Sequence, residues 1–126
     1  MAKNSHAPVN LDTAFQSFSD HWSPRIIANV GNMEVRACKL KGEFIWHSHE
    51  EADEMFLVRK GQLTLCLRDG DILLNPGDIY VVPRGVEHKP LCDEECEVLV
   101  MVQNETSTTG AEINELTNKG VALNLD

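Results

Sequence analysis

Four residues of this sequence carry side chains that bind transition metals, and their spacing could bring them to one point. His47 and His49 stand two positions apart, and Glu54 follows five positions after His49. On an extended strand, side chains two positions apart share a face, with Cα atoms about 6.6 Å apart. A hairpin could then return Glu54 beside the two imidazoles. His88 follows a rigid turn at 83–85 and could enter the same cavity. These four side chains are therefore the predicted metal ligands.

Three imidazole nitrogens and one carboxylate oxygen favour a particular class of ion. Ca²⁺ and Mg²⁺ prefer shells made of oxygen, whereas Fe, Mn, Co, Ni, Cu and Zn accept nitrogen ligands. Two histidines alone, on a polar strand, are more often solvated. Together with Glu54, His88 and the turns between them, the two histidines favour the binding of one divalent transition metal ion. An octahedral ion held by four protein ligands would keep two positions open for water, dioxygen or a substrate.

Several other side chains could line the cavity around such an ion. Those considered are Phe56 and Val58, which share the parity of Glu54, together with Tyr80 and Cys92. Phe56 and Val58 suit an ordinary barrel core at least as well. Trp46 has the parity opposite to the histidines and is expected in outer packing. The basic residues near these segments are expected to be solvated surface cations: Arg36, Lys39, Arg59, Arg84 and Lys89.

The elements that must position these residues are short strands. Alternating or apolar runs are separated by turn residues such as Lys60-Gly61, Asp69-Gly70 and Asn75-Pro76-Gly77. The predicted strands are Arg25–Val30, Met33–Leu40, Glu43–His49, Met55–Arg59, Gln62–Arg68, Asp71–Leu74, Ile79–Val82, His88–Leu91 and Glu97–Val102. So many strands in about 100 residues indicate a β-sandwich or barrel.

Before the strands, the spacing of Leu11, Phe15 and Phe18 predicts one amphipathic helix over residues 10–19, packed outside the core. With 126 residues the chain is expected to form a single domain, 1–126, with its core at about 25–102. The segment 103–126 would be a covering arm, an exchanged strand or a loose end.

Composition excludes some functions. Eleven basic and twenty acidic residues give a net charge of -9, so a nucleic-acid partner is not expected. No apolar run approaches the roughly 20 residues needed to span a bilayer. The first ten residues contain no continuous apolar core, so no secretory signal peptide is expected and a cytoplasmic location follows. The four cysteines, without a CxxC pair, are expected to be free thiols.

The histidine motifs resemble those of the cupin superfamily. Its first motif reads roughly G-x5-HxH-x3,4-E-x6-G, and Gly42, His47, His49, Glu54 and Gly61 stand in its places. The second reads G-x5-PxG-x2-H-x3-N and is matched by Gly77, Pro83, Gly85 and His88. The sequence departs from these motifs at two points. Only four residues separate Gly42 from His47, and Cys92 replaces the final Asn. Neither departure touches a predicted ligand.

The resemblance implies an all-β jelly-roll barrel, the double-stranded β-helix, with a metal held inside by three histidines and a glutamate, and often a homodimer. The segment Trp46–Val58 also resembles small single-domain bacterial cupins, many of them labelled mannose-6-phosphate isomerase-like. A shared barrel does not transfer a reaction, so that label is taken as a likeness of fold.

Three functions are compatible with these features. The first is a metal-dependent enzyme on a small organic substrate, either an oxygenase or an isomerase or lyase. The second is a non-catalytic module that binds or senses a small molecule. The third is a sugar-phosphate isomerase-like enzyme, which would need cationic residues for the phosphate. A purely structural barrel is disfavoured by the intact ligand set.

Overall fold

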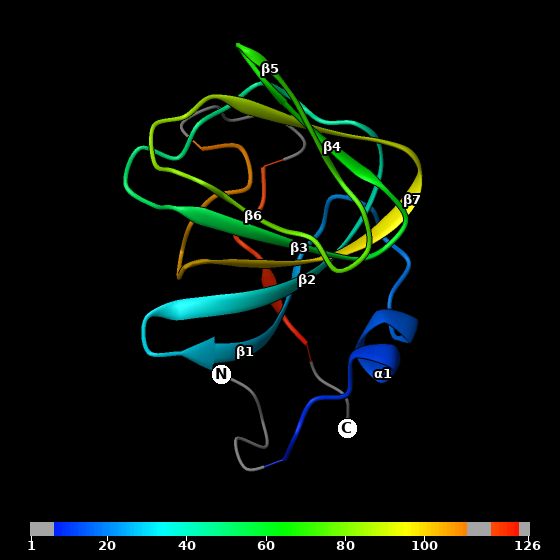
Figure 1. Cartoon of the computed structure of the whole chain (residues 1–126). Helices are drawn as coiled ribbons and strands as arrows, with labels where there is room; N and C mark the ends of the chain where they lie inside the picture. Colours follow the sequence, from blue (N-terminus) through cyan, green and yellow to red (C-terminus); the bar gives the residue numbers. More distant parts are fainter. Residues whose placement is uncertain (1–6, 111–116, 124–126) are drawn as a thin grey trace.

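The computed structural model describes residues 7–110 and 117–123. Within these residues, one short helix is followed by eight strands that close into a jelly-roll barrel (Figure 1). Their order is α1 (Leu11–Gln16), β1 (Arg25–Val30), β2 (Met33–Glu43), β3 (Glu54–Lys60), β4 (Leu63–Leu67), β5 (Gly70–Leu74), β6 (Ile79–Val82), β7 (His88–Gln103) and β8 (Val121–Ala122). The all-β fold expected from the sequence is confirmed.

Strand β7 connects the parts of the sheet. The hydrogen-bonded order is β5-β4-β7-β2-β1-β8, and β3 joins β7 to β6. The first residues of β7 pair with β4, its later residues pair with β3, and β2 runs beside both parts. Between them the register shifts, because Cys92 faces Gly42 whereas Cys96 faces Leu40. Such a bulge bends a strand, and here it lets one strand serve both halves of the barrel.

The apolar side chains form two clusters, one inside the barrel and one outside it. Alternate residues of β7, including Val98, Val100 and Val102, are buried in the interior. Outside, Phe15 and Phe18 pack with Ala37 of β2. Helix α1 begins at the predicted cap, where the Asn10 side chain accepts a hydrogen bond from the Thr13 amide at 3.0 Å. The helix therefore covers the outside of the sheet, as predicted, although it ends at Gln16.

The prediction of a strand over Glu43–His49 is wrong. Strand β2 continues to Glu43, residues 44–46 have no regular structure, and His47 forms an isolated bridge with His88. The predicted strands His88–Leu91 and Glu97–Val102 are one strand, β7, because the acidic residues between them point out at the bulge without ending it.

The C-terminal segment returns to the barrel. Strand β8 pairs in parallel with β1, and the amides of Val121 and Leu123 donate to the carbonyls of Pro24 and Ile26, both at 3.0 Å. Of the three roles considered for residues 103–126, the described residues support a covering arm. Residues 1–6, which include His6, and residues 111–116 and 124–126 lie outside the described residues.

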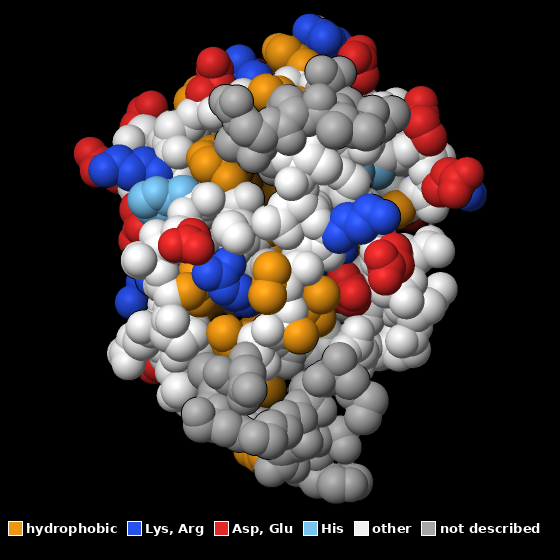
Figure 2. Space-filling model, turned by 180° about the vertical axis from the view of Figure 1, so that it is seen from behind, with side chains coloured by type: hydrophobic (Ala, Val, Ile, Leu, Met, Phe, Trp, Pro, Cys, Tyr) orange, Lys and Arg blue, Asp and Glu red, His pale blue; other side chains and the backbone are white. Residues whose placement is uncertain are grey.

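The surface is mixed in charge. Figure 2 shows Lys and Arg side chains beside Asp and Glu on the face seen from behind, with apolar side chains among them. No helix formed by the described residues is long and apolar enough to cross a bilayer. The four cysteines are free and buried.

Candidate metal centre

The isolated bridge between His47 and His88 positions two of the predicted ligands. The amide of His47 donates to the carbonyl of His88 at 3.1 Å, and the amide of His88 donates back at 2.9 Å. Because the two residues face each other directly, their side chains leave the pair on the same side, with ring centroids 4.3 Å apart. The HxH segment thus needs only one bridge to hold its first histidine against β7.

The other two residues arrive from the loop and from the start of β3. Glu54 is the first residue of β3, and its Oε1 lies 3.2 Å from His88 Nε2 and 3.3 Å from His49 Nε2. The carbonyl of His49 accepts a hydrogen bond from the Gly85 amide at 2.9 Å, so the turn before His88 also holds His49. All four residues are buried, and their potential ligand atoms lie within 4.8 Å of one another.

Backbone contacts fix how two of the imidazoles are presented. His47 Nδ1 lies 2.8 Å from the carbonyl of Ile45, and His88 Nδ1 lies 3.0 Å from the carbonyl of Val86. A carbonyl only accepts, so each Nδ1 must carry a proton and donate it. In a neutral ring this leaves the Nε2 lone pair free, which is the tautomer that a metal-ligating histidine uses.

The polar atoms at the centre of the cluster are arranged for a cation. With neutral rings, His88 Nε2 and Glu54 Oε1 face each other as two acceptors, which is favourable only with a proton or a metal ion between them. The Nε2 atom of His49 is buried and makes no hydrogen bond, although it lies 3.3 Å from Glu54 Oε1. A buried polar atom without a partner is costly. The residues present therefore fit a divalent ion.

The titration of the cluster reflects its burial. Burial, with a smaller effect of His88, lowers the pKa of His47 from 6.5 to about 4. Burial alone would raise the pKa of Glu54, but His49 and His88 outweigh it and hold that pKa below its usual range. The cluster thus favours a neutral His47 beside an ionised carboxylate, the forms in which both can ligate a metal.

A pH prediction follows from His47. As the pH falls below 6.5 the unfolded chain takes up this proton, whereas the folded chain does so only near pH 4. The unfolded state then binds more protons, so stability is lost as the pH falls. With a chelator present, we expect the protonation of His47 to lower the free energy of unfolding by about 2–3 kcal/mol as the pH falls from 6.5 to 4. Urea titrations across that range measure it. His47→Gln should flatten the dependence, and His21→Gln should leave it unchanged.

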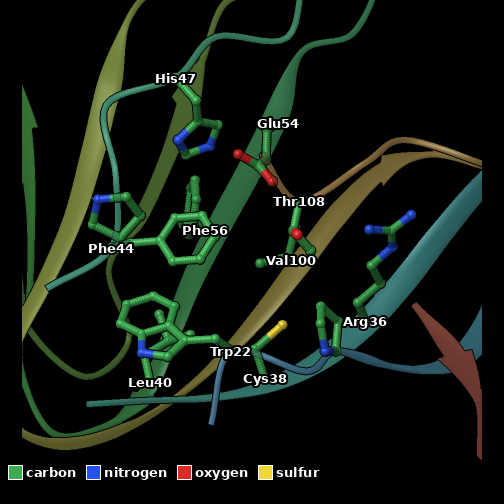
Figure 3. A pocket seen from close by; sticks show the side chains of 12 residues that line it. Trp22, Arg36, Cys38, Leu40, Phe44, His47, Glu54, Phe56, Val100 and Thr108 are labelled. Atoms are coloured by element: carbon green, nitrogen blue, oxygen red, sulfur yellow. The ribbon is translucent and has the colours of Figure 1, made fainter. Parts of the chain in front are cut away.

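A pocket of about 50 Å³ opens beside the cluster inside the barrel. Figure 3 shows His47 and Glu54 at one end and Trp22 and Leu40 at the other. Its lining residues are Trp22, Pro24, Arg36, Cys38, Leu40, Phe44, His47, Glu54, Phe56, Pro90, Val100 and Thr108. A small molecule in this pocket would have an ionic end and an apolar body.

Trp22 is a pocket residue that the sequence pattern did not reveal. Its ring stacks on Phe44 with centroids 4.7 Å apart, and the Phe44 ring contacts His47 edge-on at 5.4 Å. The Trp22 backbone has a φ of 59°, a costly value for a residue with a side chain. Hydrogen bonds of 3.0 Å from its amide to Lys39 and from its indole to Lys41 hold it there.

The expected cavity residues divide between pocket and core. Phe56 lines the pocket. Val58 and Cys92 belong to the buried cluster beyond it, and Tyr80 packs against that cluster from β6. None of these three lines this pocket.

Arg36 requires a larger correction. It was expected to be a solvated surface cation, but its exposed fraction is 2% and it lines the pocket from β2. Its parity with Cys38 and Leu40, both buried, could have indicated this inner face.

Comparisons with known proteins agree with this fold. The family model described as "Cupin domain" (Cupin_2) matches residues 38–102, which carry all four clustered side chains. This chain belongs to the cupin family. A cupin-2 domain containing protein from Shewanella frigidimarina NCIMB 400 has a crystal structure that is 43% identical to this cupin, with a TM-score of 0.73, covering 74% of this chain and 91% of that one.

Two other proteins are similar over smaller or more divergent regions. The cupin is 33% identical over 64 residues to the uncharacterized protein YdbB of Bacillus subtilis (strain 168), covering 50% of this chain and 57% of that protein. It therefore spans less than two thirds of YdbB. Protein NMB1881 from Neisseria meningitidis is 24% identical, with a TM-score of 0.70 and coverage of 77% of this chain and 99% of that one. That likeness shows the fold alone.

The C-terminal arm of this cupin holds the segment between the two histidines. Gly110 has a φ of 63°, and a Cβ atom there would overlap the Ser48 carbonyl oxygen. Nearby, the Thr108 amide donates to the Asn118 carbonyl at 2.7 Å, and Thr108 lines the pocket. The arm therefore forms part of the wall around the cluster.

We expect Gly110→Ala to displace Ser48 and with it the flanking histidines. The substitution adds a steric overlap to the roughly 1–2 kcal/mol that a left-handed alanine costs. Gly31→Ala is the matched control, because Gly31 has a φ of 61° and open space around its Cβ position. Metal affinity measured by competition with a chromogenic chelator should fall for Gly110→Ala alone. Equal affinity in the two variants would contradict this role of the arm.

Proposed function

We propose that this cupin binds one divalent transition metal ion through His47, His49, Glu54 and His88 and uses it to act on a small organic molecule. The observation that carries the proposal is the orientation of the imidazoles. Two Nδ1 atoms are fixed on backbone carbonyls, and the Nε2 atoms of His49 and His88 lie 3.3 and 3.2 Å from one carboxylate oxygen. A structural histidine cluster would instead satisfy its buried nitrogens within the protein, whereas the buried Nε2 atom of His49 makes no hydrogen bond.

The donor set favours Fe, Mn, Co, Ni, Cu or Zn over Ca²⁺ and Mg²⁺. Such an ion supplies a Lewis acid at the end of the pocket, with positions left for water, dioxygen or substrate. The residues of the chain would orient the reactant. Phe44, Phe56 and Trp22 exclude water from its apolar part, and Glu54 remains an anion next to the imidazoles.

Pocket size distinguishes the reactions considered. About 50 Å³ gives room for roughly four water molecules. This volume suits the substrate of a small-molecule oxygenase, isomerase or lyase better than a sugar phosphate. The same pocket could serve a non-catalytic binding module, so turnover must be measured.

The metal proposal is tested by elemental analysis. The chain, purified without a histidine tag, should carry close to one equivalent of transition metal after incubation with Fe²⁺, Mn²⁺ or Zn²⁺ and gel filtration. Dialysis against a chelator should remove the metal and lower the melting temperature, because an ion that binds only the folded state stabilises it. A chain that retains no metal and shows no thermal shift would contradict the proposal.

Turnover separates an enzyme from a binder. Oxygen uptake by the iron-loaded chain with small acids, thiols or phenols would support an oxygenase. Proton exchange or rearrangement of these compounds without oxygen uptake would support an isomerase or lyase. Thermal stabilisation by a compound that is never converted would support the binding module. The homodimer and the cytoplasmic location stay predictions, and the molar mass in solution tests the former.

A further inference from the structure

The pocket contains a second ionic group, at some distance from the clustered histidines. Arg36 is 2% exposed and extends from the inner face of β2, in line with Cys38 and Leu40. Figure 3 shows its side chain on the side of the pocket away from Phe44 and His47. A charged side chain is rarely buried so completely unless it is paired or binds a ligand.

The partner of Arg36 uses only part of the guanidinium. Its Nε and Nη2 atoms donate to the same oxygen of Glu34, Oε1, at 3.0 and 2.8 Å. A guanidinium has five N–H donors in a planar fork. Within residues 7–110 and 117–123, no acceptor is found for the other three. This free edge of the planar guanidinium is suited to a planar acceptor that enters the pocket.

The charge of the pocket indicates what kind of acceptor that is. A divalent ion with three neutral imidazoles and one carboxylate leaves a single positive charge at the cluster. Arg36 and Glu34 neutralise each other and add none. A monoanion would therefore balance the charge of the buried pocket, whereas a neutral ligand would leave it uncompensated.

The rest of the wall determines the body of the ligand. Trp22, Leu40, Phe44 and Val100 offer apolar surface between the two ionic ends. The volume of about 50 Å³ limits the ligand to the space of roughly four water molecules. A short aliphatic chain fits this space and this surface.

We propose that the pocket binds a small aliphatic monocarboxylate, whose acid group accepts hydrogen bonds from the free edge of Arg36. Its apolar chain lies against Trp22 and Phe44, and its other end faces the histidine cluster. This inference rests on the proposed function for the charge balance and for the reaction at that end. The contact with Arg36 belongs to this chain's own residues and can be measured separately.

The probes are sodium butyrate and its neutral isostere butyramide. Trp22 reports binding by fluorescence in a Trp46→Phe background, because these are the two tryptophans of the chain and Trp46 lies outside the pocket beneath Arg68. Butyrate should bind at least about tenfold more tightly than butyramide, the change that a charge-assisted hydrogen bond gives. Equal binding of the two compounds would overturn the proposal.

Two substitutions test Arg36 in opposite directions. Glu34→Gln removes the competing carboxylate and should tighten butyrate binding several-fold. Arg36→Lys keeps the charge, loses the planar fork and should weaken butyrate binding about tenfold. Glu43→Gln is the control, because Glu43 pairs with Lys89 outside the pocket. If Arg36→Lys does not fold, the Glu34→Gln result decides, since that variant retains the guanidinium.

Metal content is measured on the same samples. If the chain binds metal but its butyrate affinity is unchanged by Glu34→Gln, the acid binds elsewhere. This result would overturn the inference and leave the proposed function intact. A chain that binds no metal but still binds butyrate more tightly after Glu34→Gln would support the inference and contradict the proposed function.

Discussion

Replacing His49 with alanine is expected to weaken metal binding by more than about 100-fold while changing the chelated protein little. Zinc sites with four protein ligands bind with about 10–16 kcal/mol, so one ligand contributes roughly 3 kcal/mol, or more than about 100-fold in affinity. The Nε2 atom of His49 is buried without a hydrogen bond, so removing this atom breaks no hydrogen bond. Titration with Zn²⁺ against a chromogenic chelator measures the affinity, and thermal unfolding in the chelator measures the fold.

The combination of these two readouts distinguishes a metal ligand from a structural histidine. His21→Ala is the matched control, because His21 lies outside the cluster and contacts Glu95 at the surface at 2.6 Å. It should retain both full metal affinity and the metal-dependent rise in melting temperature. If His49→Ala and His21→Ala bind Zn²⁺ equally well, His49 is not a ligand. If His49→Ala instead unfolds in the chelator, its role is structural.

The convergence of the four clustered residues could be predicted from the sequence although one of its premises was wrong. The expectation of a strand through His47 and His49 is not met, because the chain leaves β2 at Glu43 and forms only one bridge. That bridge is enough, since it pairs His47 directly with His88. The turn at 83–85, expected to deliver His88, also holds the loop through the Gly85 amide. The identity and spacing of the predicted ligands and of the turn residues were therefore more informative than the expected secondary structure between them.

The pocket was much less predictable than the cluster. Its wall includes Trp22, Arg36 and Thr108, which lie outside the motifs. Trp22 precedes β1 in a segment without periodicity, and Thr108 follows the last long strand, so no local pattern relates either one to the histidines. Arg36 was assigned to the surface because isolated charges are usually solvated. Alternation along β2 could have corrected that assignment, since period-two patterns report the face of a strand whatever the residue type.

Gly61→Ala is expected to destabilise the barrel strongly, and Gly42→Ala provides a matched control. Gly61 lies in the turn between β3 and β4, with a φ of 82°, and a Cβ there would lie 2.8 Å from both Cys96 Cβ and the Glu95 carbonyl oxygen. Those atoms belong to the bulge of β7, which cannot move without disturbing strands on both sides. We expect a loss of about 2–5 kcal/mol, from the left-handed conformation together with the overlap.

Gly42→Ala isolates the steric part of this effect. Gly42 has the same φ of 82°, but its Cβ position has no atom within 4 Å. Its substitution should cost only the conformational part, about 1–2 kcal/mol. Urea unfolding of both variants in a chelator excludes any contribution from metal, so the difference between their unfolding free energies measures the contact with β7. Equal losses would mean that the bulge yields to the new methyl group, and that the close approach of this turn to β7 is not required for the barrel to close.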